Sequence, residues 1–433
     1  MTPEAQDPTD LERQVLEAVD EQTLLADLAA LVAQAPVGGS AGEVAVQRWC
    51  AARLRELGLD VAEWDVDLDA EVAHPDFPGM EVAREALVGL VATRARAGDV
   101  GRPALVLCGH TDVVPVEDPA RWRTDPFVLH VADGTATGRG ACDMLGGVAA
   151  IIAAVRALAT TAAAPERPLA VHLVSGEEDG GVGAFATLRA GHLGAACLIA
   201  EPTGGAVIPA NAGSLTFRLE LDGRAAHGST RTLGESALDH LEVVQSCLRD
   251  LERRRNADAP TDFAHLDLVA PISVGMLRSG TWASTVPDLL VAEGRYGVLP
   301  DEPLGTARKV FEEAVAALGE QDPWLAEHPV RVSWPGGAFA SGSLPSGDPL
   351  LGETLAAAAE AGAPPPRVEG APYGSDLRHY AAHGVPTVQY GPGELGQAHA
   401  VDESVPVDEL VSCARAYALL ALRRCWAPPQ QAD

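Results

Sequence analysis

Three short apolar segments, each followed at once by small and charged residues, constrain the fold of this chain most. They are Ala104–Cys108 before GHTDVV, Leu169–Val174 before SGEEDGG, and Ala195–Ile199 before AEPTGG. Helical segments separate them, notably Leu145–Thr160 after the turn GRGACDM. Short unbroken apolar strands that alternate with helices predict an α/β unit with a largely buried sheet. Because function in such units gathers where strands end, the polar residues after each segment are the first candidates.

The pattern changes near Asn211, where the segment SLTFRLELDG alternates apolar and polar residues. Such alternation predicts a half-exposed antiparallel strand. It is followed by a predicted helix over about Glu235–Arg254, strands near Leu266–Leu277 and Leu289–Val298, and a helix over about Leu304–Leu318. This order indicates a small α+β sandwich inserted into the larger unit.

The segments before and after the predicted insertion both have the α/β pattern. Ser40 is a predicted helix N-cap, with Glu43 completing a capping box. The chain therefore divides into a first part of the main domain, residues 1–210, an inserted domain, 211–335, and a second part, 336–433. The other predicted elements are helices over Asp10–Gln34, Ser40–Leu57, Pro349–Ala361 and Val407–Cys425, and a strand over Pro386–Tyr390.

Charge and cysteine usage exclude several classes of function. The 433 residues include 61 Asp and Glu against 31 Lys and Arg, a formal net charge of −30. Nucleic acids and anionic membranes bind basic surfaces, so neither is expected as a partner. The seven cysteines are scattered without a CxxC pair, as is typical of reduced thiols. With no apolar stretch near the ~20 residues of a membrane span, we expect a cytoplasmic protein.

Titratable residues follow the predicted strands and turns. Taken singly, each has an ordinary interpretation, such as an N-cap for Asp143 or an exposed loop acid for Glu201. Taken together, they converge on the ends of the strands of one α/β unit. The set is His110, Asp112, Asp143, Glu177, Glu178, Glu201 and His399.

Several carboxylates at one sheet edge repel one another unless a cation neutralises them. Two histidines with three carboxylates suit a pair of divalent ions that share a bridging carboxylate. Mixed nitrogen and oxygen ligation favours zinc, with cobalt or manganese as alternatives. Such a pair acidifies a bridging water and polarises a carbonyl, which is the chemistry of a hydrolase. One carboxylate must stay unligated to accept the proton of the water.

The motifs resemble those of the dinuclear zinc amidohydrolases and exopeptidases, a family that includes acetylornithine deacetylase, succinyl-diaminopimelate desuccinylase and bacterial glutamate carboxypeptidase. The resemblance runs from about Leu105 to Pro406 and rests on GHTDVVPV, TGRGACDMLGG, VSGEEDGG, AEPTG, GRAAHGS, WASTVPD and PGELGQAHAVDE, in the order of the family. It implies a catalytic domain like that of metallo-exopeptidases, with a mixed, largely parallel sheet flanked by helices. It also implies that the inserted α+β domain is a lid that mediates homodimerisation.

The resemblance also assigns roles to residues. It implies that His110 and Glu201 each ligate one zinc, and that Asp143 bridges the two ions. Glu178 and His399 would complete the two coordination shells.

Two further carboxylates receive roles outside the ligand set. Asp112 would orient His110, and Glu177 would be the general acid and base that passes the proton of the water to the leaving amine.

The roles of residues in the inserted domain and near it rest on resemblance or on residue type alone. The resemblance makes His227, in GRAAHGS, an oxyanion stabiliser that reaches the active site of the partner subunit. Ser284 replaces an asparagine that is common in the lid strand, and Arg295 and Arg378 are candidate carboxylate ligands as well as candidate structural arginines. Trp282 is expected in the core of the lid.

Three hypotheses follow. The leading one is a metal-dependent deacylase that cleaves the amide of an N-acyl amino acid or related small N-acyl amine through a water that bridges the metals. The second is a metallo-exopeptidase, a dipeptidase or carboxypeptidase, with the same site. The third is a non-catalytic dimeric paralogue, which the complete set of predicted ligands disfavours.

Overall fold

The computed structural model describes residues 9–161, 164–257 and 260–426. The chain divides into two compact units. The first comprises residues 1–209, 343–369 and 379–433, and the second comprises residues 210–342 and 370–378. The residue range of the second unit nearly coincides with the predicted insertion, 211–335. It ends seven residues later than predicted and also includes a short later segment. Its suggested roles as lid and dimerisation domain remain predictions.

The first unit is built on a six-stranded mixed sheet. In spatial order the strands are β1 (Asp60–Asp65), β2 (Val88–Arg94), β6 (Leu169–Val174), β3 (Leu105–His110), β7 (Cys197–Ile199) and β19 (Thr387–Gln389). The last four of these strands are parallel to one another, and β1 and β2 are antiparallel to their neighbours. The expectation of a mixed, largely parallel sheet flanked by helices is therefore confirmed.

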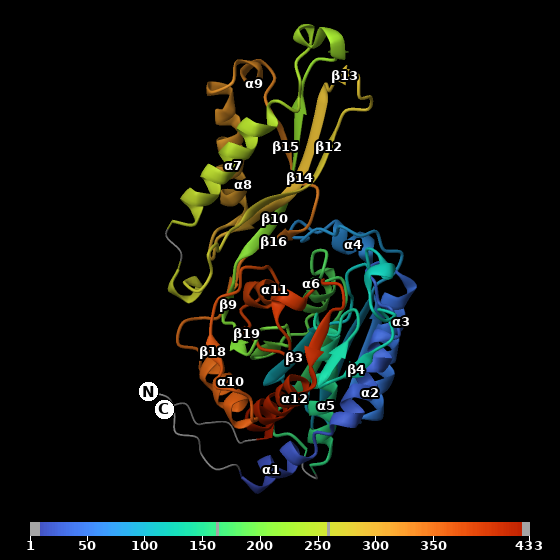
Figure 1. Ribbon diagram of the computed structural model, residues 1–433. Coiled ribbons are helices and arrows are strands. Elements are labelled where there is room, and N and C mark those ends of the chain that lie inside the picture. Colours follow the sequence, from blue (N-terminus) through green and yellow to red (C-terminus); the bar gives the residue numbers. More distant parts are fainter. Residues whose placement is uncertain (1–8, 162–163, 258–259, 427–433) are drawn as a thin grey trace. The chain divides into compact units, whose positions relative to one another are not determined.

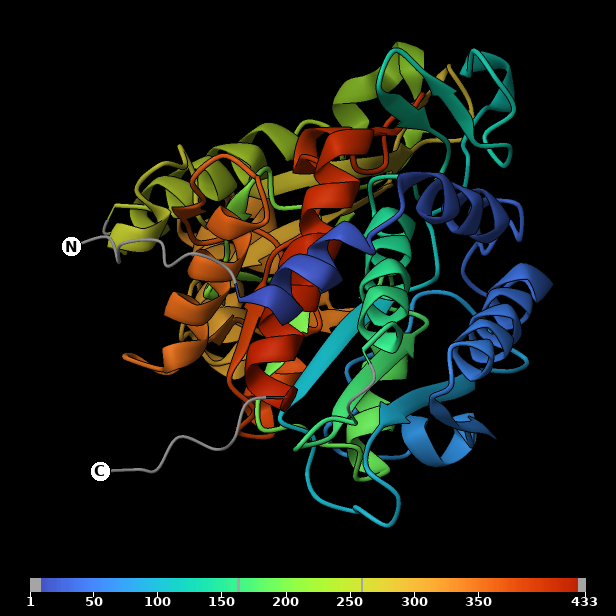
Figure 2. The same cartoon turned by 90° about the horizontal axis from the view of Figure 1, so that it is seen from below.

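Helices bury the sheet. Every residue of β3 and β6 is buried, as expected for strands covered on both faces. Helices α5 (Leu145–Ala159) and α12 (Val407–Ala421) lie side by side (Figures 1 and 2), and α5 also packs on α2 (Glu21–Val32) and on β3. The helices are α1 (Asp10–Glu17), α2 (Glu21–Val32), α3 (Ala41–Glu56), α4 (Leu68–Val72), α5 (Leu145–Ala159), α6 (Val182–Arg189), α10 (Pro349–Glu360), α11 (Leu377–Ala382), whose first two residues belong to the second unit, and α12 (Val407–Ala421).

A small antiparallel sheet and a two-stranded pair complete the first unit. In the small sheet β5 (Thr135–Thr137) lies between β4 (His130–Ala132) and β20 (Ser404–Pro406). The pair joins β8 (Ala206–Val207) to β18 (Arg367–Val368). Because β20 pairs with β5, the segment after His399 lies against the turn that leads to Asp143.

The second unit is an α+β sandwich. Its long strands β12 (Ile272–Ser279), β14 (Leu289–Val298) and β10 (Gly213–Asp222) are antiparallel, and β15 (Arg331–Ser333) and β16 (Ala338–Phe339) both pair with β10. The alternation read in the sequence is realised, since every second residue of β10 is buried. A short ladder joins β11 (Ala226–His227) to β13 (Thr285–Val286), and the helices are α7 (Leu241–Arg255), α8 (Leu304–Ala316) and α9 (Pro323–Glu327).

Some element boundaries differ from expectation. The first predicted helix is two helices, because the carboxylate of Asp20 accepts the amide of Thr23 and starts α2 anew. Helix α7 begins at Leu241, six residues later than predicted, and the strand expected from Leu266 begins at Ile272. Trp282, expected in a core, is 73% exposed.

The structure also provides a test for membrane insertion. No helix within residues 9–161, 164–257 and 260–426 combines the length and the apolar character that crossing a bilayer requires.

His172 on β6 ties the stability of the first unit to pH. Its ring is buried, and its Nδ1 lies 2.8 Å from the hydroxyl of Tyr380. Burial lowers the pKa of His172 to about 3, with a smaller contribution from His192. The folded protein therefore keeps His172 neutral at a pH where the unfolded chain protonates it. The stability that this group contributes is complete above the unfolded pKa of ~6.5 and falls as the pH drops towards 3.

We expect the variant His172→Gln to lose less stability in acid than the wild type. Between pH 7.5 and pH 5.0 the wild type should lose about 2 kcal/mol more than the variant, since each pH unit below ~6.5 costs about 1.4 kcal/mol. Urea unfolding in a chelator at both pH values measures the difference. His130→Gln, at an exposed histidine on β4, is the control. An equal acid dependence in wild type and His172→Gln would contradict the prediction.

Candidate metal centre

The parallel strands bring the predicted site residues of the first unit to one edge of the sheet. His110 is the last residue of β3, Glu177 and Glu178 follow β6, and Glu201 follows β7. Because β6, β3 and β7 are parallel neighbours, their carboxyl ends meet at this edge. Asp143 lies two residues before α5 begins at Leu145.

One group of ligand atoms surrounds His110. Its Nε2 lies 3.1 Å from Oδ1 of Asp143 and 3.9 Å from Oε2 of Glu201. Ligand atoms of His110, Glu177 and Glu201 all lie within 4.8 Å of one another, and all three residues are buried. One imidazole and several carboxylate oxygens are thus close enough together to ligate one metal ion.

A second group surrounds His399. Its Nε2 lies 3.0 Å from Oε2 of Glu178 and 3.6 Å from Oδ2 of Asp143. The backbone of His399 has a φ of 61°, in the left-handed region that non-glycine residues seldom adopt. Asp143 thus turns one carboxylate oxygen towards His110 and the other towards His399, as a bridging carboxylate would.

The charges of the two groups show that the donor set fits divalent cations. Burial disfavours a charged His110, but its hydrogen bond to Asp143 and the charges of nearby carboxylates such as Glu201 raise its pKa well above the usual range. The hydrogen bond to Glu178 raises the pKa of His399 to about 9. Burial, followed by the charge of Asp143, raises the pKa of Glu178. The carboxylates are therefore stabilised by positive charge placed between them. Nitrogen and oxygen donors at these distances suit zinc-type ions.

Asp112 is buried beneath the loop that carries the two adjacent glutamates. Its carboxylate accepts the main-chain amides of Glu177 and Glu178, each at 3.2 Å. The Nδ1 of His110 lies 3.0 Å from the main-chain carbonyl of Asp112 and 3.7 Å from its carboxylate. The sequence interpretation paired Asp112 with His110, and the structure adds that Asp112 also holds the loop of both glutamates.

A buried ion network behind this loop was not foreseen from the sequence. The guanidinium of Arg84 is fully buried and donates to Glu43 and to Asp179, at 3.0 and 2.7 Å. Glu43 accepts the amide of Gly39 at 2.8 Å, whereas the predicted capping box needs the amide of Ser40. Arg84 thus ties α3 to the residue after Glu178. Its partners are 41 and 95 residues away, and no local spacing signals them.

The predicted residues of the inserted domain lie in the second unit. His227 is exposed, and its Nδ1 lies 2.7 Å from the hydroxyl of Ser229. The ladder of β11 and β13 brings the segments of His227 and Ser284 together, since the amide of Gly228 donates to the carbonyl of Ser284 at 2.6 Å. The two motifs GRAAHGS and WASTVPD therefore form one local structure.

The two candidate arginines make structural contacts. Arg295 donates to the carbonyl of Pro372 at 2.9 Å. Arg378 is buried, donates to the carbonyl of Ser375 at 2.7 Å, and lies over the ring of Phe339 at 4.1 Å. These contacts favour the interpretation of both as structural arginines.

Comparisons with known proteins agree with this site. Residues 106–423 match the model of peptidase family M20/M25/M40. The succinyl-diaminopimelate desuccinylase of Stenotrophomonas maltophilia is 31% identical over 376 residues, 81% of this chain and 94% of that protein. The N-formyl-4-amino-5-aminomethyl-2-methylpyrimidine deformylase of Bacillus subtilis is 25% identical over 398 residues, 87% of this chain and 88% of that protein.

Solved structures show the same fold. The crystal structure of human carnosine dipeptidase 1 superposes with a TM-score of 0.75 and 16% identity, over 96% of this chain and 99% of that one. The resemblance that the motifs suggested is confirmed, and so is the expectation of an enzyme. The chain belongs to peptidase family M20/M25/M40 and is a metal-dependent hydrolase.

Proposed function

We propose that this enzyme is a deacylase that hydrolyses the amide bond of an N-acyl amino acid or a related small N-acyl amine. The observation that carries the proposal is the position of Asp143 between two imidazoles. Each of its oxygens faces a histidine that also has a carboxylate of its own nearby. A carboxylate whose two oxygens face two different histidines suits a pair of adjacent divalent ions.

Two sets of residues would hold the ions. His110 and Glu201 would ligate one ion, and His399 and Glu178 the other, with Asp143 shared between them. Zinc is the proposed metal, with cobalt or manganese as alternatives, because imidazole and carboxylate ligands suit all three. When bound, such ions supply Lewis acidity, which acidifies water and polarises a carbonyl.

Glu177 is the proposed general base and acid. It takes the proton of the attacking water and gives it to the nitrogen of the leaving amine, so that the carbonyl carbon gains an oxygen as the C–N bond breaks. Its carboxylate lies within 4.8 Å of ligand atoms of His110 and Glu201. Asp112 supports this role because it holds the amide of Glu177.

The relatives favour a deacylase over an exopeptidase. The two curated relatives compared above are named for removing a succinyl and a formyl group. The dipeptidase is similar in fold at 16% identity. An exopeptidase that acts on a dipeptide or a C-terminal residue is the second candidate, since the same site serves both reactions.

The thiols support a cytoplasmic location. Six of the seven cysteines are buried, and Cys247 is half-buried. Reduced, buried thiols are typical of proteins in a reducing compartment.

The activity is tested by assaying the protein with zinc, cobalt or manganese on N-formyl, N-acetyl and N-succinyl amino acids and on dipeptides. We expect at least one N-acyl amino acid to be cleaved faster than every dipeptide. Glu177→Gln should then lower kcat by at least ~10², because the proton transfer loses its base, while the bound metal stays constant. Glu56→Gln, at an exposed glutamate, is the control.

Three outcomes would contradict parts of this proposal. Faster cleavage of dipeptides would favour the exopeptidase. A loss of only a few-fold in Glu177→Gln would remove Glu177 from its role. Well under one zinc-type ion per chain, measured by elemental analysis, would refute the pair of ions.

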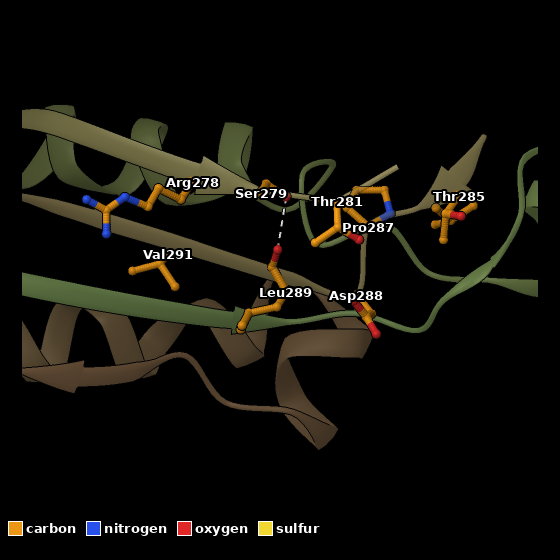
Figure 3. Close-up of a pocket in the computed structure, with 10 residues that line it drawn as sticks. Arg278, Ser279, Thr281, Thr285, Pro287, Asp288, Leu289 and Val291 are labelled. Atoms are coloured by element: carbon orange, nitrogen blue, oxygen red, sulfur yellow. Dashed lines mark hydrogen bonds between the residues drawn. The ribbon is translucent and has the colours of Figure 1, made fainter. Parts of the chain in front are cut away.

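We further propose a homodimer formed through β12 of the second unit. Among the described residues, β12 ends the order of its sheet and pairs only with β14. Met276 and Leu277 on this strand are 45% and 46% exposed. The end of β12 and the start of β14 border a cavity of about 280 Å³. Figure 3 shows the residues that line it, with Ser279 donating to the carbonyl of Leu289. An exposed apolar edge strand readily pairs with another copy of itself.

The dimer should dissociate when charge is placed on this edge. We expect the wild type to sediment as a dimer and the double variant Met276→Lys/Leu277→Lys as a monomer, because burying two ammonium groups is costly. The matched control is Val128→Lys/Val131→Lys, at exposed apolar residues of the first unit. A monomeric wild type, or a double variant that stays dimeric, would contradict the interface.

The proposed role of His227 in the partner's site is tested by mixing two inactive variants. If His227 acts across the dimer, a heterodimer of His227→Ala and Glu177→Ala contains one intact site. Mixing equal amounts after dissociation and reassociation should then restore about a quarter of the wild-type activity. Each variant reassociated alone is the control. Absence of recovery would show that each site is self-contained.

A further inference from the structure

A buried carboxylate outside the predicted ligand set holds the turn that carries Asp143. Glu403 is 1% exposed and lies four residues after His399. Its Oε1 accepts the amides of Cys142 and Asp143, at 3.0 and 2.9 Å. Its Oε2 accepts the amide of Gly140 at 3.0 Å and Nη1 of Arg139 at 2.7 Å. All of these donors belong to the segment 139–143.

Glu403 also takes part in the main-chain contacts of the same two segments. Its carbonyl accepts the amide of Gly138 at 2.9 Å. The next residues form β20, which pairs with β5 over Thr135–Thr137. The main chain thus brings the segments together, and the side chain of Glu403 adds the contact that reaches Asp143 itself.

Burying this carboxylate would be costly unless it were satisfied. Three main-chain amides and one guanidinium meet that cost, and charge-assisted hydrogen bonds of this kind are among the stronger ones in proteins. Arg139 is itself 3% exposed and lies over the ring of Trp122 at 5.1 Å. The turn amides in turn need Glu403, because buried amides without acceptors are destabilising.

The segment that precedes Glu403, residues 399–402, also needs contacts that hold its backbone in place. His399 and Asp402 both have positive φ values, 61° and 56°. A non-glycine residue stays in this region only where its surroundings hold it there. Glu403, directly after Asp402, anchors the end of this segment.

We propose that Glu403 is a positioning residue that sets the separation of Asp143 and His399, which lie 3.6 Å apart between Oδ2 and Nε2. The inference rests on the function proposed above, in which both residues are metal ligands. The two carboxylate oxygens of Glu403 are hydrogen-bonded to the segment 139–143, so this role needs no contact with the substrate or the ions. Glu403 acts through the main chain of Asp143 and through the segment that it shares with His399.

The first test measures metal affinity. Zinc is titrated into the metal-free full-length protein against a chromophoric chelator, for the wild type, Glu403→Gln and Glu403→Asp. We expect at least one of the two ions to bind ~10–100-fold more weakly in both variants, as is usual when groups behind metal ligands are altered. The aspartate variant keeps the charge but is one methylene too short to reach all donors, which guards against a variant that does not fold.

The matched control is Asp27→Asn. Asp27 is also a buried carboxylate held by arginines, Arg53 and Arg156, but it lies on α2. Its variant should lose stability while binding zinc like the wild type, so that a general loss of stability is told apart from a loss of positioning.

The second test needs no metal and no substrate. Hydrogen exchange of the metal-free protein, followed by mass spectrometry, should show at least ~10-fold faster exchange in peptides covering 138–145 for Glu403→Gln than for the wild type, because three amides lose a charged acceptor. Asp27→Asn should leave these peptides unchanged.

The outcomes separate this inference from the proposed function. Wild-type zinc affinity in the folded Glu403 variants, or unchanged exchange over 138–145, would overturn the role of Glu403. A wild type that binds two ions but cleaves none of the amides would instead overturn the proposed reaction, and the affinities of the variants would still decide the role of Glu403.

Discussion

Mutual repulsion among carboxylates at one edge of a buried sheet is the constraint on which the first unit depends. Asp143, Glu178 and Glu201 lie around two imidazoles, and the raised pKa values of His110 and His399 reflect the positive charge that these acids require. A divalent ion would meet the same requirement with two charges in place of one proton. The formal net charge of −30 therefore says little about the site, because the few acids of the site are balanced by positive charge close to them.

Three buried groups keep these acids in place despite their repulsion. Asp112 accepts the amides of Glu177 and Glu178, Arg84 ties the next residue, Asp179, to α3, and Glu403 accepts the amides around Asp143. Each acts on the main chain or on a neighbour of a predicted ligand, and so it can hold the ligand without competing for a cation. Sites of this kind work because their geometry exists before the substrate or ion arrives.

The parts of the fold and site that follow from local pattern were predictable. Apolar runs of strand length are buried in the sheet whatever their partners, so β3, β6 and β7 and the polar residues after them could be read from the sequence. Parallel neighbours place such residues at one edge, which is why His110, Glu178 and Glu201 could be grouped without a structure. Alternation likewise predicted β10 of the second unit.

The parts that depend on distant partners were not predictable. Glu403 stands 260 residues from Asp143 and Arg84 stands 95 from Asp179, so their ordinary-looking positions acquire meaning only in the fold. The prediction for Trp282 is wrong because it rested on residue type alone, whereas Trp282 lies in the loop between β12 and β13 and is 73% exposed. Because a ligand can be recognised by its residue type and its place at a strand end, whereas its supporting residue can be any buried group that reaches it, sequence reasoning finds the ligands first and their supports only through the structure.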